Sequence, residues 1–222
     1  NYLEDIDNFE TFKKKKWNEC IERNKKDFQK DINKKNPELI KKIKNKKDKF
    51  NLVRTVDNIL NEAKNNEFIE ALLMKDPTTQ NFHENTQLEY QNKKGNNIKK
   101  LPGSGKKALY LSESELITNQ SKKPDKGTKS LDFFNKDKRQ YVYAKHTEED
   151  GGSQDNQCKD CKIFIEEADK YCNKYPNKGE KFILLIDGKY YNDNRRKKLK
   201  SMISNNNKEK IIVCSSDTYP IS

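Results

Sequence analysis

The chain of 222 residues is poor in apolar side chains and in several residue types that often carry chemistry. Only 31% of it is hydrophobic against 37% charged, and it has two histidines and one tryptophan. No apolar run approaches the roughly 20 residues that a membrane-spanning helix needs, so the sequence predicts no membrane segment. The chain starts at Asn1 without a signal-peptide pattern, and we expect a further piece to precede it.

The chain also has few cysteines, and their number is odd. The five cysteines form an odd set with no regular framework, which predicts reduced thiols and a cytoplasmic setting. Cys158 and Cys161 have the spacing of half a zinc site, but Cys172 lies close to whole helical turns further on. We therefore expect these thiols to line one packed helix face rather than to bind zinc.

The charge is strongly positive. Lys and Arg number 47 against 35 Asp and Glu, which gives a net charge of +12. This balance favours a polyanionic partner such as nucleic acid, with an anionic membrane surface as the other option. A chain rich in both Lys and Asn is also typical of an AT-rich genome, where lysine fills solvated surface.

The first third of the chain reads as helices. Trp17, Cys20 and Ile21 follow helical spacing, and Pro37 suits the first turn of a second helix. Thr78 or Thr79 is expected to cap a later helix that carries Phe82. We predict a helical region over residues 1–75, whose lysine runs are solvated faces.

The remainder, residues 76–222, predicts a second type of domain. Strand patterns and helix patterns alternate here, and the expected order is strand 130–134, strand 139–147, helix 155–175, strand 181–188, helix 194–203 and strand 210–216. Strands joined through helices imply an α/β fold, a mixed central sheet flanked by helices.

Two strands place an acid and a base together. If residues 130–134 pair antiparallel with 139–147, Asp132 approaches Lys145. A carboxylate can bind Mg²⁺ and a lysine can act on the attacking water, as in a phosphodiesterase. An ordinary surface ion pair is the alternative. A single carboxylate supplies few ligand atoms for Mg²⁺. The candidates for a second carboxylate are Glu84, Glu89, Glu148, Glu149 and Asp155.

The set "TKSLDF", "AKHT", "GGSQDNQ" and "FILLIDGKYY", with "DPTTQNFHE" upstream, resembles the type II restriction endonucleases of the PD-(D/E)XK superfamily. The resemblance covers residues 76–222 and implies a restriction-endonuclease-like core that cuts double-stranded DNA with Mg²⁺ as a homodimer. It implies Asp132 as metal ligand and Lys145 as the lysine that acts on water. Tyr143 stands where the family has an acid, and the resemblance implies that Glu84 on a preceding helix completes the metal shell.

Further residues are expected to contact DNA. The loop Gly103–Lys107 lacks the spacing of a nucleotide-binding P-loop, but its lysines suit a phosphate. The polar start of the helix after Gly151 suits base edges or phosphates, or else caps the helix through Asp155 or Asn156. The predicted DNA-contacting residues are Lys106, Lys107, His146, Gln154, Asp155, Asn156, Gln157, Arg195 and Arg196.

The sequence thus predicts a sequence-specific, Mg²⁺-dependent endonuclease, with the N-terminal helices as dimer interface or DNA clamp. The main alternative is a non-catalytic nucleic-acid-binding module, favoured by the charge and by Tyr143. A third is an interaction domain of a Lys/Asn-rich eukaryotic parasite, which extracellular disulfides would favour.

Overall fold

The computed structural model describes residues 8–118, 124, 128–148 and 152–220, with the backbone alone at 79, 80 and 152–155. The chain divides into two compact units. One combines Asn1–Phe9 with His83–Ser222, and we call it the sheet unit. The other is Glu10–Phe82, the helical unit. The boundaries therefore fall between Phe9 and Glu10 and between Phe82 and His83, whereas the sequence predicted a single boundary after residue 75.

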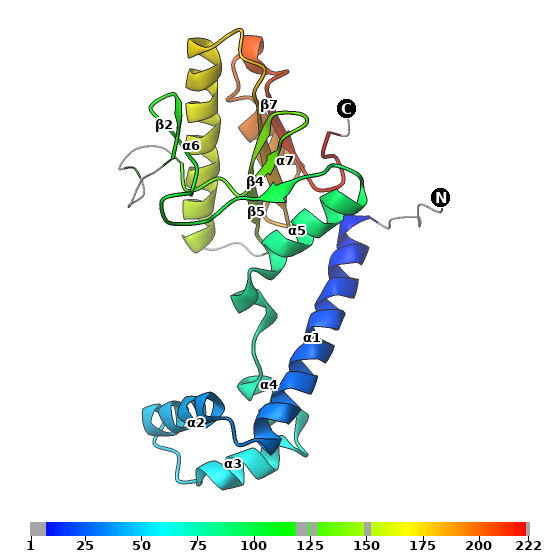
Figure 1. The fold of residues 1–222 in the computed structure, drawn as a ribbon, viewed down its shortest axis with the longest axis vertical. Helices are drawn as coiled ribbons and strands as arrows, with labels where there is room; N and C mark the ends of the chain where they lie inside the picture. Colours follow the sequence, from blue (N-terminus) through cyan, green and yellow to red (C-terminus); the bar gives the residue numbers. More distant parts are fainter. Residues whose placement is uncertain (1–7, 119–123, 125–127, 149–151, 221–222) are drawn as a thin grey trace. The chain divides into compact units, whose positions relative to one another are not determined.

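Helices and strands follow one another in the order shown in Figure 1. They are α1 (Phe9–Asn33), α2 (Pro37–Lys49), α3 (Val56–Ala63), α4 (Glu67–Leu73), η1 (Pro77–Gln80), α5 (Phe82–Lys93), β1 (Lys99–Lys100), β2 (Tyr110–Ser112), β3 (Glu115–Ile117), β4 (Phe133–Asn135), β5 (Gln140–His146), α6 (Gly152–Lys174), β6 (Lys181–Asp187), α7 (Asp193–Lys200), η2 (Asn205–Asn207) and β7 (Ile211–Cys214).

A mixed sheet of five strands forms the centre of the sheet unit. Its order is β1-β4-β5-β6-β7, and β2 and β3 form a separate antiparallel pair. β4 is antiparallel to both β1 and β5, whereas β5, β6 and β7 are parallel. The parallel pairs require crossovers, which α6 and α7 supply. The predicted mixed α/β sheet with helices is confirmed.

The two faces of this sheet pack against two separate hydrophobic cores. Side chains alternate along β5, so Tyr143 packs with Phe164 and Ile165 of α6, while Val142 and Ala144 face the opposite core. Figure 1 shows α6 running along one side of the sheet. The predicted helix face is confirmed, because Cys161 and Cys172 are buried in the same core as Phe164.

The helical unit has a core of its own. Seven buried side chains form it: Phe28, Ile32, Leu39, Ile43, Leu60, Ala63 and Leu73. Pro37 is the first residue of α2, as predicted, and the Asn36 side chain accepts a hydrogen bond from the Glu38 amide there.

Two predicted helix caps are wrong. α5 begins at Phe82 after Asn81, so neither Thr78 nor Thr79 lies at its N-terminus; Asp76 instead caps η1 through the Thr78 amide. α6 begins at Gly152, so Asp155 and Asn156 lie inside the helix rather than at its N-cap. In both cases the helix starts at a different residue from the one that its short polar side chains suggest.

All five cysteines are free thiols, and four of them are buried. Within the part of the chain that the structure describes, no helix is both long and apolar enough to cross a membrane.

Candidate active site

Asp132 lies directly before β4, at the point where β5 approaches its end. The backbone of Asp132 pairs with β5, its amide donating to the Val142 carbonyl at 2.9 Å. Its carboxylate Oδ2 accepts a hydrogen bond from the Ala144 amide at 2.7 Å. The antiparallel pairing predicted from the sequence is therefore present, and it fixes the position of the acid next to β5.

Charges of three further side chains act on Asp132. Burial raises the pKa of its carboxyl to about 6, and the Lys145 ammonium is the strongest influence in the opposite direction. The Glu84 carboxylate of α5 raises this pKa further, and Lys100 lowers it. Charges have such effects at short range. The structure thus brings the three predicted catalytic residues, Asp132, Lys145 and Glu84, into one neighbourhood.

Glu84 is held by a strand that the sequence did not single out. Lys100 of β1 forms an ion pair with Glu84 at 2.9 Å and donates to Asn85 at 3.0 Å. β1 pairs with β4, where Lys100 is opposite Phe133. Lys100 is therefore a member of the site that periodicity could not identify, because the pairing that places it joins segments more than thirty residues apart.

Tyr143 occupies the place expected for an acid, and the structure makes its role clear. Its side chain is buried and its ring stacks on Phe164, with centroids 5.4 Å apart. Burial raises the pKa of the Tyr143 hydroxyl far above its ordinary value. A neutral phenol is a poor ligand for Mg²⁺, so Tyr143 is a core residue. The Lys145 ammonium lies 4.1 Å from the centre of this ring, a cation–π distance.

Asp160 of α6 is a second acid on the same side of the sheet. After burial, its carboxylate is the largest influence that raises the pKa of Tyr143, and Asp132 is the next. The Asp160 side chain is 16% exposed and pairs with Lys129 at 2.7 Å. Sequence reasoning missed Asp160. The sequence feature that could have identified Asp160 is its position beside Cys161 and four residues before Phe164, because this spacing puts a charge on the apolar face of the helix.

The Gly/Lys loop is attached to the segment that carries Asp132. The Leu101 amide donates to the Asp132 carbonyl at 2.8 Å, and the Ser130 hydroxyl donates to the Gly103 carbonyl at 2.8 Å. The Leu131 amide donates to the Leu109 carbonyl at 2.7 Å. Lys106 and Lys107, both exposed, are therefore on a loop anchored at the candidate site.

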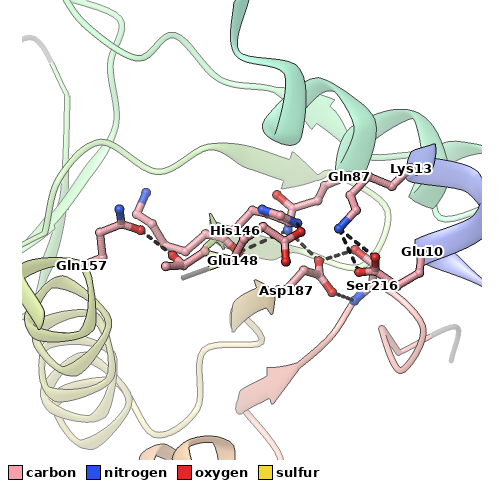
Figure 2. Close-up of polar contacts among 10 residues, drawn as sticks. Glu10, Lys13, Gln87, His146, Glu148, Gln157, Asp187 and Ser216 are labelled. Carbon is pink, nitrogen blue, oxygen red and sulfur yellow. Dashed lines mark hydrogen bonds and ion pairs between the residues drawn. The ribbon is translucent and has the colours of Figure 1, made fainter. Parts of the chain in front are cut away.

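The other residues predicted to contact DNA have varied surroundings. The His146 ring stacks on His83 with centroids 3.8 Å apart and pairs with Glu148 at 3.2 Å. Gln157 accepts a hydrogen bond from the Thr147 hydroxyl at 2.6 Å (Figure 2), and Asn156 is exposed. The side chains of Gln154 and Asp155 lie outside the described residues.

The two arginines of α7 are partly engaged within the sheet unit. Arg195 donates to the Tyr190 carbonyl at 2.9 Å, and its guanidinium lies 4.0 Å from the centre of the Tyr190 ring. Arg196 is 3.7 Å from Asp193. The structure places neither arginine in contact with Asp132, Lys145 or Glu84 among the interactions of the described residues.

A buried polar network closes the adjoining ends of the parallel strands. Asp187, the last residue of β6, accepts hydrogen bonds from Gln87 of α5 at 2.7 Å and from the Ser216 amide and hydroxyl at 2.9 and 2.6 Å (Figure 2). Burial raises the pKa of Asp187, and these donors oppose the rise. Because each Asp187 oxygen already has a protein donor, we interpret this carboxylate as a structural link between α5, β6 and the segment after β7.

The comparisons with known proteins identify no relative. Neither family models nor curated proteins nor solved structures match this chain.

Proposed function

We propose that the chain is a Mg²⁺-dependent endonuclease that cuts double-stranded DNA at a specific sequence, with a PD-(D/E)XK-like core. The observation that supports it is the antiparallel pairing of the Asp132 segment with β5, which carries Lys145, followed by a helix crossover into the parallel strand β6. This order of elements is what the resemblance implies. The basic net charge and the anchored Lys106–Lys107 loop suit a DNA substrate.

The proposed ligands of the cation are carboxylates, whose oxygens are the donors that a hard divalent cation prefers. Asp132, with Oδ2 held by the Ala144 amide, would be the first ligand, and Asp160 or Glu84 the second. Bound there, Mg²⁺ would neutralise the scissile phosphate and lower the pKa of a coordinated water. Lys145 would orient that water and stabilise the charge that develops on the phosphate oxygens.

The direct test is cleavage of unmethylated plasmid DNA in Mg²⁺, with sequencing of the ends. Asp132→Asn should lower the rate roughly 10²–10⁴-fold, because it removes the ligand charge while retaining an acceptor for the Ala144 amide. Asp160→Asn and Glu84→Gln test which of the two acids is the second metal ligand. Substitution of that acid should lower the cleavage rate about as much as Asp132→Asn does, and substitution of the other acid should not. Tyr143→Phe is the matched control and should cut at the parent rate.

One observation favours a second candidate, a non-catalytic nucleic-acid-binding module. Tyr143 is a buried core residue at the acid position, and the Lys145 ammonium lies over its ring. On this alternative, the chain binds DNA stably but cuts it with none of the divalent metals. Lys145→Ala would then weaken the salt-dependent binding only slightly.

A further inference from the structure

Lys100 lies at one edge of the central sheet, on the face against which α5 packs. β1 is the outermost strand and pairs with β4, where Lys100 is opposite Phe133. Residues opposite each other in an antiparallel pair share a face of the sheet, and Phe133 packs in the same core as Leu88 of α5. The Lys100 side chain therefore reaches α5, where its ammonium lies 2.9 Å from Glu84 and 3.0 Å from Asn85.

The ion pair between Lys100 and Glu84 is open to water. The Lys100 side chain is 38% exposed and that of Glu84 is 29% exposed. Ion pairs of this exposure contribute little to stability, because water and dissolved ions screen both charges. Lys100 can therefore exchange Glu84 for another anion at small cost. It also precedes, in the same segment, the loop with Lys106 and Lys107, whose predicted partners are DNA phosphates.

The acids and lysines around Asp132 balance each other. Lys145 and Lys100 lower the pKa of the Asp132 carboxyl, and Glu84 raises it, so all three charges act on one group. When Asp132 is ionised, two carboxylates accompany two ammonium groups and their charges cancel. A divalent cation therefore gains little from the net charge of this cluster. It must also compete with the Lys100 ammonium for the oxygens of Glu84.

A DNA phosphate changes this balance. Its negative charge attracts the Lys100 ammonium as a carboxylate does. Transfer of Lys100 to the phosphate leaves the Glu84 carboxylate without this cation, and a divalent cation bound by Glu84 and Asp132 then compensates both acids. Each ligand therefore strengthens the binding of the other, which is a thermodynamic coupling between the two sites.

We propose that Lys100 exchanges partners, pairing with Glu84 in the free protein and with a DNA phosphate in the complex, and that this exchange releases Glu84 to bind the divalent cation. Metal and DNA then bind cooperatively, and the cation is held weakly until DNA is present. The inference rests on the proposed function, with Glu84 as the second metal ligand, but it does not require cleavage.

Titration of the full chain with Mn²⁺, without DNA, tests the competition between lysine and metal. The electron paramagnetic resonance signal of free Mn²⁺ gives the dissociation constant, and Asp132→Asn shows which part of the binding belongs to this site. Lys100→Met removes the ammonium and should lower this constant roughly 10-fold. Lys99→Met is the matched control and should leave it unchanged, because exposed Lys99 precedes Lys100 on the strand and points to the opposite face.

A double variant tests whether the effect passes through Glu84. Glu84→Gln combined with Lys100→Met should remove the gain in Mn²⁺ affinity, because the released carboxylate is then absent. A gain that persists would mean that the loss of any nearby positive charge attracts the metal, and it would overturn the exchange. Lys100→Gln should behave as Lys100→Met does, and unchanged thermal unfolding would show that both variants fold.

The coupling is also measurable from the DNA side. Fluorescence anisotropy of a labelled duplex gives the dissociation constant of DNA in EDTA and in saturating Ca²⁺, a second hard cation. The ratio of the first constant to the second should be roughly 10-fold larger for the parent than for Lys100→Met, and Lys99→Met should keep the parent ratio. A purely structural role of Lys100 would change both constants equally, and an unchanged ratio would therefore contradict the proposal.

Other results would also overturn the exchange. One is a Mn²⁺ affinity of Lys100→Met equal to that of the parent. Another is a gain in Lys129→Met alone, which would assign the exchange to the ion pair between Lys129 and Asp160. The two proposals fail separately. A parent chain that cuts DNA without this coupling contradicts only the exchange, whereas coupled binding of metal and DNA without cleavage contradicts only the nuclease.

Discussion

At the scale of single residues, the site depends on a carboxylate that the fold stabilises poorly. Asp132 is largely withdrawn from water, and the Lys145 ammonium and the Ala144 amide only partly offset the cost of its charge. Buried charged groups of this kind are typical of functional sites, where a charge that lowers the stability of the folded state is retained because the function needs it. The sequence predicted that Asp132 lies near Lys145, because side chains alternate along paired strands and this fixes which of them can meet.

Replacing Asp132 by Asn should stabilise the protein at neutral pH, by about 1–2 kcal/mol after allowance for partial solvent contact. The pKa of this carboxyl is about 6 in the folded chain against an ordinary 3.8, so the folded state holds its proton more tightly. Ionisation therefore weakens folding as pH rises from about 4 to about 6. Urea unfolding at several pH values should show the gain of Asp132→Asn growing over that interval and constant above it.

The same substitution at Asp48, an exposed residue of α2, is the control and should change stability by less than about 0.5 kcal/mol. A gain for Asp132→Asn that is equally large at pH 4 would contradict the argument.

At the scale of elements, the ends of β5 and β6 are tied together by backbone. The Thr147 amide donates to the Asp187 carbonyl at 3.0 Å, and the Tyr190 amide donates to the Thr147 carbonyl at 3.1 Å. Gly188 makes this close approach possible with φ +93°, a conformation that side chains disfavour. The sequence showed a buried strand ending at a Gly, but it could not show which backbone would pack against that Gly.

Gly188→Ala should destabilise the chain by about 3 kcal/mol or more, because it combines left-handed strain with a clash. A Cβ at this position would lie 2.1 Å from the Thr147 carbonyl oxygen. The shift of the urea midpoint at constant slope measures the loss. Gly103→Ala is the matched control, since no atom lies within 4 Å of its Cβ position; an equal loss there would refute the explanation.

At the scale of the whole molecule, the net charge of +12 belongs to two units with different local surfaces. The sheet unit presents Lys106 and Lys107 on a loop anchored to the Asp132 segment. The helical unit carries the lysine run of α1 within a helix that also bears acids. Total charge alone therefore does not say where a polyanion binds.

Substitution of Lys106 and Lys107 by Ala should reduce the slope of log affinity against log salt for DNA by about 2, one for each lost phosphate contact. Fluorescence anisotropy with a labelled duplex over a range of salt gives this slope. Lys14→Ala with Lys15→Ala removes the same charge from exposed positions of α1 and should leave the slope unchanged. Equal changes for both pairs would mean that net charge, rather than a local contact, governs binding.

The sequence alone determined the elements and the pairing at the centre of the site. Period-two and period-3.6 patterns are local, so they located β5, α6, β6 and the antiparallel partner of β5, and with them Asp132 and Lys145. What only the tertiary structure decided is non-local. It placed Lys100 on a strand paired with β4, and it brought Asp160 of α6 close enough to influence the pKa of Tyr143. These depend on segments far apart in the chain, and no repeat in the sequence encodes which of them meet.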